Sequence, residues 1–147
     1  MIDLKRQFQL RESIELFYFG YRAFTAHADR LLARRGLGRV HHRILYFVGR
    51  NPDVAINSLL RILGVTKQAL NAPLRQLIEK RLVSVRPATH DRRVRQLCLT
   101  RDGERLEGQL TGVQMKQLVR VFQAAGPKAE RGLRVIMQSM SDGGRDE

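Results

Sequence analysis

Residues 56–78, INSLLRILGVTKQALNAPLRQLI, decide the fold. Apolar residues recur at helical intervals on both sides of Gly64, and a glycine readily adopts the left-handed backbone conformation that ends a helix. Thr66 follows shortly after, and its hydroxyl can cap the N-terminus of a new helix. The stretch therefore predicts two helices around a tight turn, the first over residues 56–63 and the second beginning at Thr66.

The second of these helices has one apolar and one polar face. The positions expected to face inward are Leu70, Leu74, Leu77 and Ile78, and those expected on the opposite side are Lys67, Gln68, Asn71 and Arg75. Glutamine and asparagine can pair with adenine, and lysine and arginine with guanine or phosphate. An ordinary solvated face has the same residue types, so both interpretations stay open here. Pro73 is expected to bend or loosen this helix, because it cannot donate a hydrogen bond to the carbonyl of Ala69.

A pair of alternating segments follows the second helix. Residues 82–86 are rich in β-branched side chains, residues 94–99 alternate again, and the segment 87–93 between them is polar and includes two adjacent arginines. This pattern predicts a β-hairpin with a basic tip. A tight helix pair followed by such a hairpin is the layout of a winged helix-turn-helix, whose second helix enters the major groove of duplex DNA.

Longer helical segments flank this central unit. Residues 8–35 carry an apolar seam with heptad-like steps, and residues 40–50 resume helical spacing before the turn at 51–53. Thr100 can cap a helix that runs to about Ala125, and Gly126-Pro127 starts a last amphipathic helix. The predicted fold is mainly α with a small β-hairpin wing, in the order ααααββαα.

Composition indicates a polyanionic partner. Lysine and arginine number 27 against 14 acidic residues, a net charge of +13, which favours nucleic acid ahead of an anionic membrane surface. Cys98 is the single cysteine, which suits a reducing cytosol. The first eleven residues mix charged and apolar side chains without the apolar run of a signal peptide or membrane span. We therefore expect a soluble, cytoplasmic protein with no membrane association.

At the hairpin the sequence resembles the MarR family of bacterial regulators (multiple antibiotic resistance regulators). The residues that carry the resemblance are Leu82-Val83, Asp91-Arg92-Arg93, Leu97-Cys98-Leu99-Thr100 and Gly103. The helix order matches that family over essentially the whole chain. The resemblance implies that Arg93 enters the minor groove, oriented by Asp91, with Arg92 on the backbone or groove edge. The enhanced negative potential of a narrow minor groove favours an inserted arginine. A flexible loop whose charges only maintain solubility is the alternative.

The resemblance also implies how the chain is organised. Residues 1–38 would form an N-terminal dimerisation helix, 39–100 the DNA-binding winged helix-turn-helix, and 101–147 the C-terminal helices that complete the dimerisation region, in one domain overall. The expected function is a sequence-specific repressor that binds a palindromic operator as a homodimer, through major-groove residues Thr66, Lys67, Gln68, Asn71 and Arg75. A sequence-tolerant architectural, nucleoid-associated protein is the alternative, since the +13 charge would also serve that role.

Most members of that family are released from DNA by a small ligand. The residues expected near such a pocket are Tyr18, Arg22, His41 and His42, although packing or solvation would equally explain each of them. No metal or other cofactor is expected, because the four histidines and Cys98 have no metal-binding spacing. Cys98 is expected to act as a small hydrophobic residue of the wing, with a redox switch as the alternative. No catalytic motif or phosphate-binding loop is present in the sequence, so an enzyme is not expected.

Overall fold

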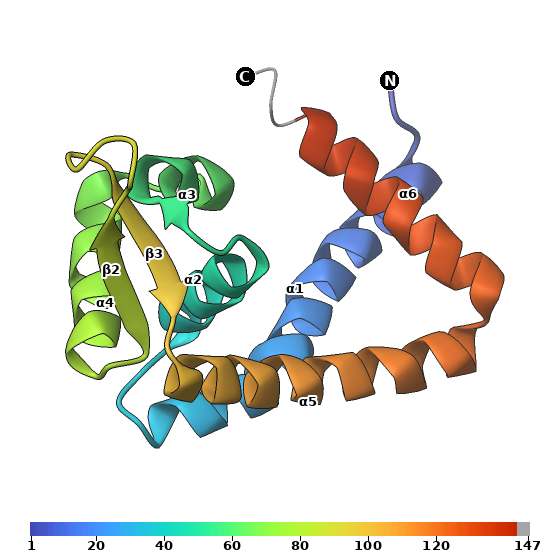
Figure 1. Ribbon diagram of the computed structural model, residues 1–147. Helices are drawn as coiled ribbons and strands as arrows, with labels where there is room; N and C mark the ends of the chain where they lie inside the picture. The colour runs from blue at the N-terminus through green and yellow to red at the C-terminus, as the bar shows by residue number, and fades with distance from the viewer. Residues whose placement is uncertain (144–147) are drawn as a thin grey trace. The chain divides into compact units, whose positions relative to one another are not determined.

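The computed structural model describes residues 1–143 (Figure 1), so residues 144–147 of the predicted C-terminal segment lie outside the described part. The chain forms two compact units, Met1–Val113 and Gln114–Glu147. The elements in chain order are α1 (Leu4–Ala33), α2 (Arg39–Arg50), β1 (Val54–Ala55), α3 (Ile56–Leu63), α4 (Lys67–Glu79), β2 (Val83–Pro87), β3 (Arg95–Leu99), α5 (Arg101–Ala125) and α6 (Pro127–Gly143). The predicted class, mainly helical with a small antiparallel wing, is confirmed.

The turn between α3 and α4 follows the local chemistry of its residues. Gly64 ends α3 with a φ of 65°, and its amide donates to the carbonyl of Leu60. Thr66 caps α4 because its hydroxyl oxygen accepts a hydrogen bond from the amide of Ala69 at 3.1 Å. Helix α4 runs on through Pro73 without ending there. The predicted helix pair is therefore confirmed at both of its turn residues.

The sheet has one strand more than the sequence pattern predicts. Its order is β1-β3-β2, and β1 pairs with β3 through Val54 opposite Leu97 and Ala55 opposite Gln96. The turn at residues 51–53 is present as predicted, but no strand was predicted after it, because a strand of two residues has no alternation to detect. Strand β2 starts and ends one residue later than predicted, and β3 starts one residue later but ends at Leu99 as predicted. The wing is thus anchored to the strand that precedes the helix pair.

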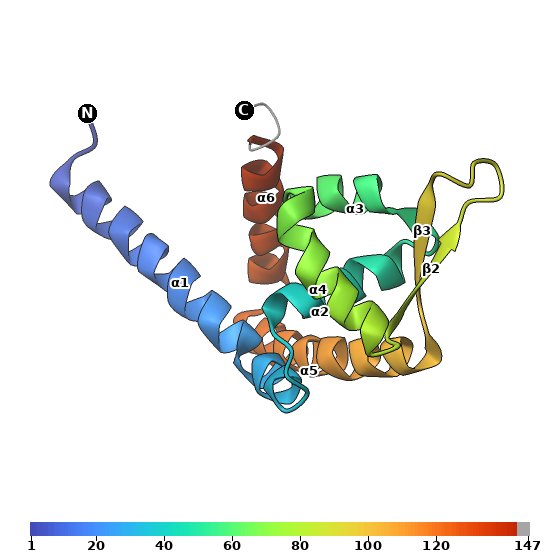
Figure 2. The same ribbon diagram turned by 90° about the vertical axis from the view of Figure 1, so that its left-hand side faces the viewer.

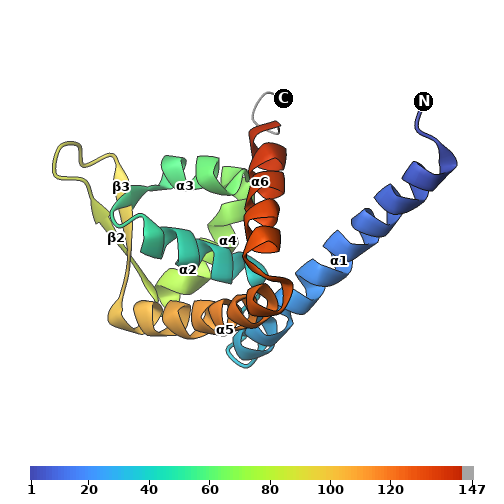
Figure 3. The ribbon, with the colours of Figure 1, turned by 90° about the vertical axis from the view of Figure 1, so that its right-hand side faces the viewer.

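The core of the first unit brings together the middle of the chain and parts of both flanking helices. Fully buried side chains come from the C-terminal part of α1, from α2, α3, α4 and the sheet, and from the first turns of α5: Leu32, Ile44, Leu45, Leu59, Leu70, Leu77, Leu97, Leu106 and Leu110. Figure 2 shows α2, α3 and α4 grouped beside the sheet. The N-terminal part of α1 extends away from this group (Figure 3) and its side chains are almost all exposed. This helix starts at Leu4, earlier than predicted, because Asp3 caps it by accepting from the amide of Arg6 at 2.8 Å.

The start of α5 is fixed to the turn between α4 and β2. The Thr100 hydroxyl donates to the carbonyl of Arg81 at 2.6 Å and accepts from the amide of Gly103 at 3.0 Å. The Thr100 amide donates to the carbonyl of Leu82 at 3.1 Å. A Cβ atom on Gly103 would overlap that same carbonyl oxygen, so only glycine fits at this crossing. The motif residues Leu82, Thr100 and Gly103 therefore form one packed junction.

Candidate nucleic-acid interface

The tip of the wing holds one arginine in a defined direction. The amide of Arg93 donates to Asp91 Oδ1 at 3.0 Å, its Nε donates to the same oxygen at 3.2 Å, and its Nη2 donates to Asp91 Oδ2 at 3.4 Å. The side chain of Arg93 is 92% exposed, whereas that of Asp91 is 35% exposed. The loop between β2 and β3 is closed at its base by a hydrogen bond, in which the amide of Ala88 donates to the carbonyl of Val94 at 2.8 Å. Asp91 thus aligns a guanidinium group that remains in solvent.

The same contacts favour the ionised form of the aspartate. The backbone amide of Arg93 and then its side chain lower the pKa of Asp91 below its ordinary value. The carboxylate is therefore charged throughout the neutral range and remains a good acceptor for the arginine. Exposed ion pairs contribute little to stability, so the main effect of the Asp91–Arg93 pair is to orient the arginine side chain. Arg92 is exposed next to it.

Helix α4 presents the polar face that its spacing predicts. Leu70, Leu74 and Leu77 are buried against the core. The predicted groove-facing residues are all exposed: Thr66, Lys67, Gln68, Asn71 and Arg75. Arg75 Nε lies 3.9 Å from Glu79 Oε1, a loose surface pair one turn further along. The beginning of α4 is therefore the part of the helix with free amide and cationic groups.

The wing tip and the beginning of α4 lie toward the same end of the first unit. Helix α4 passes into β2 through a short turn, and β2 then runs back along the helix before it reaches the tip (Figure 1). Two surfaces that suit a groove, a polar helix face and an exposed arginine, are thus presented together. The sequence alone predicts the polar helix face and the exposed arginine. That both lie toward the same end of the first unit follows from the packing of α4 on β2.

The four predicted ligand-pocket residues lie in two different settings. Tyr18 and Arg22 are exposed on α1, with the Arg22 guanidinium 5.5 Å from the centre of the tyrosine ring. His41 accepts from the amide of Gly38 through Nδ1 at 2.9 Å, and its Nε2 lies 2.6 Å from Gln76 Oε1 on α4. His42 is buried, and burial lowers its pKa. The two histidines therefore support the packing of α2 against its neighbours.

The expectation for Cys98 is wrong. Its thiol donates to Asp53 Oδ1 at 3.0 Å, and Arg86 Nη2 approaches the sulfur at 3.5 Å and the same carboxylate oxygen at 3.2 Å. The thiol, followed by the positive charge of Arg86, lowers the pKa of Asp53. Cys98 and Arg86 lie on neighbouring strands and Asp53 just precedes β1, so this polar cluster depends on the strand that the sequence did not reveal.

Comparison with known proteins places the chain among bacterial regulators. The profile of the MarR family matches residues 35–94. The HTH-type transcriptional regulator PetP of Rhodobacter capsulatus is 43% identical over 134 residues, which cover 91% of this chain and 81% of that protein. The chain belongs to the MarR family. The family resemblance carried by the wing and by Gly103 is thereby confirmed.

Solved structures of MarR-type regulators share the fold. A MarR family transcription regulator superposes with a TM-score of 0.80 at 18% identity, over 95% of this chain and 93% of its own. FabT of Streptococcus pneumoniae, solved in complex with DNA, has a TM-score of 0.79 at 18% identity, over 91% and 98% of the two chains. MepR of S. aureus, also solved with DNA, has a TM-score of 0.73 at 16% identity, over 87% and 93%. This MarR regulator thus shares its fold with FabT and MepR, both of which were crystallised with DNA.

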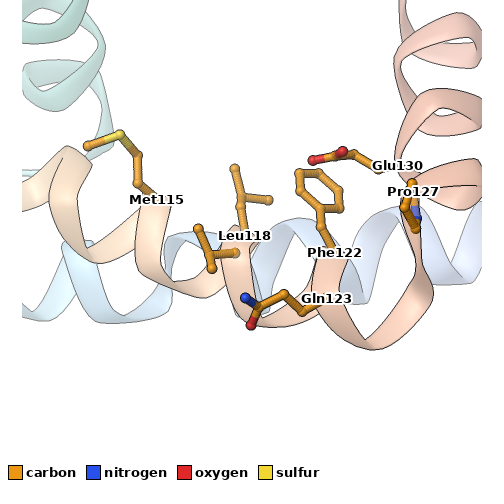
Figure 4. A pocket seen from close by; sticks show the side chains of 7 residues that line it. Met115, Leu118, Phe122, Gln123, Pro127 and Glu130 are labelled. Atoms are coloured by element: carbon orange, nitrogen blue, oxygen red, sulfur yellow. The ribbon is translucent and has the colours of Figure 1, made fainter.

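One feature of this MarR regulator lies outside the winged unit. In the second unit, α5 and α6 enclose an apolar hollow of about 660 Å³ (Figure 4). Its lining residues are Met115, Leu118, Val119, Phe122, Gln123, Pro127 and Glu130. The sequence did not predict this hollow, because its existence depends on the angle between α5 and α6. Within residues 1–143, no helix combines the length and apolarity needed to cross a bilayer.

Proposed function

We propose that this MarR-family chain is a repressor that binds a palindromic DNA operator as a homodimer in the cytoplasm and is released by a small-molecule ligand. The observation that carries the proposal is the wing tip, where Asp91 holds an exposed Arg93 in a fixed direction. An arginine that only maintained solubility would have no need of two side-chain hydrogen bonds to one carboxylate. The DNA complexes of FabT and MepR, which share the fold, support the same function.

In this proposal each protomer uses two grooves. Helix α4 lies in the major groove, with base-edge or phosphate contacts from Thr66, Lys67, Gln68, Asn71 and Arg75, all of which are exposed. Arg93 enters the adjacent minor groove, where the negative potential favours it, and Arg92 lies at the groove edge. The net charge of +13 draws the protein to the duplex from a distance.

The homodimer is supported by where apolar side chains remain exposed. Of the large apolar side chains exposed among the described residues, all but Val40, Ile62 and Val65 lie before Arg22 or after Val113. Patches of this kind on a helical protein mark interaction surfaces. We propose that residues 1–38 and 101–147 form the dimer and that residues 39–100 bind DNA. A two-fold dimer would place two α4 helices about one duplex turn, roughly 34 Å, apart.

Selection of duplexes from a random library, followed by competition with random duplex, distinguishes sequence-specific binding from the architectural alternative. Duplexes enriched from a random library are labelled, and their complex with the protein is competed by unlabelled random duplex at physiological salt. Sequence-specific recognition predicts that about 10³-fold or more random duplex is needed for displacement. Displacement by an equal amount of random duplex would establish the sequence-tolerant architectural function instead.

A charge-matched pair of variants tests the wing. Arg93→Ala should weaken binding of the enriched duplex and reduce the slope of log K against log salt by about 1 for each protomer, because one fewer counterion is released. Lys128→Ala removes the same charge from an exposed position on α6 and should change neither quantity appreciably. Equal behaviour of the two variants in anisotropy titrations would exclude Arg93 from the interface.

The effector part of the proposal places a small ligand beside α1 and α2. Tyr18 and Arg22 form an exposed cation–π pair on α1 that would receive an anionic aromatic compound, and His41 and His42 are the candidate residues on α2. Compounds of this class are screened by thermal shift and then tested for release of the enriched duplex. A compound that releases the wild-type protein from the enriched duplex, but does not release Arg22→Ala, would support a ligand site at Arg22. Equal release of both proteins would exclude that site.

A further inference from the structure

The outermost ridge of α4 is mostly not cationic. With 100° between successive residues, the positions directly opposite the buried Leu70, Leu74 and Leu77 are Gln68, Ala72 and Glu79. Asn71 lies on the flank of this ridge, and Lys67 lies further round toward the buried side. Glu79 is in the last turn, whereas helix-turn-helix proteins contact bases with the first turns of the recognition helix. Gln68 and Ala72, one turn apart and both exposed, therefore form the central part of the reading face.

The polar side chains one turn beyond Ala72 point away from it. His41 Nδ1 accepts from the Gly38 amide, so the proton is on Nε2 and is donated to Gln76 Oε1 at 2.6 Å. This bond draws the Gln76 side chain back toward α2. The Arg75 guanidinium lies near Glu79, further along the helix. The centre of the reading face thus presents a methyl group to the groove, and its small size permits close approach of the helix backbone.

We infer that Ala72 is a specificity-determining residue whose methyl group contacts the C5-methyl of a thymine, while Gln68 pairs with an adenine nearby. The inference rests on the proposed function, because it requires α4 to lie in the major groove. Thymine is the one base that presents a methyl group there, and apolar side chains contact it, whereas glutamine can bond to both N6 and N7 of adenine. Each half-site therefore contains an A·T pair opposite Ala72.

Uracil substitution tests the contact without changing the hydrogen-bonding pattern of the DNA. In the enriched duplex, each thymine is replaced in turn by deoxyuridine, which removes the C5-methyl alone. Burial of one methyl group is worth about fourfold in affinity, so at one thymine of each half-site the replacement should weaken wild-type binding by about that factor. Ala72→Gly and Ala72→Ser should bind the thymine and deoxyuridine duplexes with nearly equal affinity.

Ala69→Gly is the matched control, because Ala69 is exposed on the same helix but lies on its flank. This variant makes the same substitution in the same helix and should retain the fourfold response to deoxyuridine. An enriched duplex that shows no sensitive thymine, or a response that persists in both Ala72 variants, overturns the inference and leaves the proposed function intact. Failure to enrich any duplex over random competitor overturns the proposed function and this contact with it.

Discussion

At the wing tip, a single carboxylate has two opposing electrostatic effects. Asp91 orients Arg93, which favours insertion into a groove, but its own negative charge repels the phosphate backbone. Asp91→Ala should therefore weaken binding to the enriched operator several-fold and leave binding to random duplex equal or tighter, because the net charge rises by one. Both affinities are measured by anisotropy at the same salt concentration.

Glu104→Ala is the charge-matched control for this variant. Glu104 is exposed in the first turn of α5 and has no role in the wing, so its removal should shift both affinities in the same, slightly favourable direction. A parallel loss on both duplexes for Asp91→Ala would contradict an orienting role. It would instead mean that the aspartate maintains the folded loop.

Another residue-level effect is the pH dependence of stability that His42 produces. Burial lowers its pKa, and this effect outweighs the opposite influence of Glu107 and Asp29. The unfolded chain binds the proton first, near its ordinary value of 6.5, so the stability present above that pH is lost as pH falls toward the folded pKa. The free energy of unfolding should therefore decrease between about pH 7 and pH 5.

Denaturant unfolding of two histidine variants tests whether His42 causes this pH dependence of the free energy of unfolding. His42→Gln keeps a polar side chain of similar size but cannot titrate, so its stability should change less with pH than that of the wild type. His90→Gln, at an exposed position in the wing, should retain the full dependence. A pH profile that is unchanged in His42→Gln would show that another group causes it.

At the scale of elements, the junction between the α4–β2 turn and α5 depends on one glycine. A side chain at Gly103 would meet the carbonyl of Leu82, which already accepts from the Thr100 amide. Gly103→Ala should destabilise the protein by about 2–4 kcal/mol, because backbone atoms rather than a flexible side chain must move. Thermal and urea unfolding measure the change.

Gly108 provides the control in the same helix. No atom lies within 4 Å of a Cβ built there, and the position is exposed. Gly108→Ala should stabilise the protein by about 0.5–1 kcal/mol, since alanine restricts the unfolded chain and favours the helix. If both substitutions had the same small effect, the junction would be looser than its geometry indicates.

Elements fixed by local chemistry could be predicted, and those fixed by distant pairing could not. The turn glycine at 64, the cap at Thr66 and the alternation of the hairpin are properties of neighbouring residues, and each defined a boundary to within about one residue. Strand β1 exists only because β3 lies beside it. The bonds of Cys98 to Asp53 and of His41 to Gln76 join residues 45 and 35 positions apart, so no local pattern could reveal them.

The exposure of the candidate site residues was easier to predict than the contacts that surround them. Residues of the groove-facing surface are exposed, and exposure follows directly from helical and hairpin periodicity. The sequence does not show which polar residues are already hydrogen-bonded within the protein. Gln76 is bonded to His41, and Arg86 is bonded to Asp53. The structure therefore reduces the number of candidate DNA-contacting residues, because it identifies side chains that are already bonded elsewhere.

For the whole molecule, the proposed dimer explains why so many apolar side chains remain exposed on the terminal helices. Phe17 is 43% exposed on α1 and Ile136 is 54% exposed on α6. The double variant Phe17→Glu/Ile136→Glu should be monomeric in light scattering at micromolar concentration, because four glutamates would have to be desolvated in the interface. Val40→Glu, which places one glutamate per protomer on α2 at a position about as exposed as Phe17, should remain dimeric.

Loss of the dimer should affect the palindrome far more than the half-site. A dimer that has engaged one half-site presents its second winged unit at high effective concentration, which raises affinity by about 10²–10⁴-fold without any new contact. The monomeric double variant should therefore bind a full palindrome and an isolated half-site with similar affinity, whereas the wild type and Val40→Glu should prefer the palindrome by about 100-fold or more. A wild-type protein that is monomeric, or that binds both duplexes equally, would contradict the two-fold arrangement, because the wing and α4 would then act as a single independent reading unit.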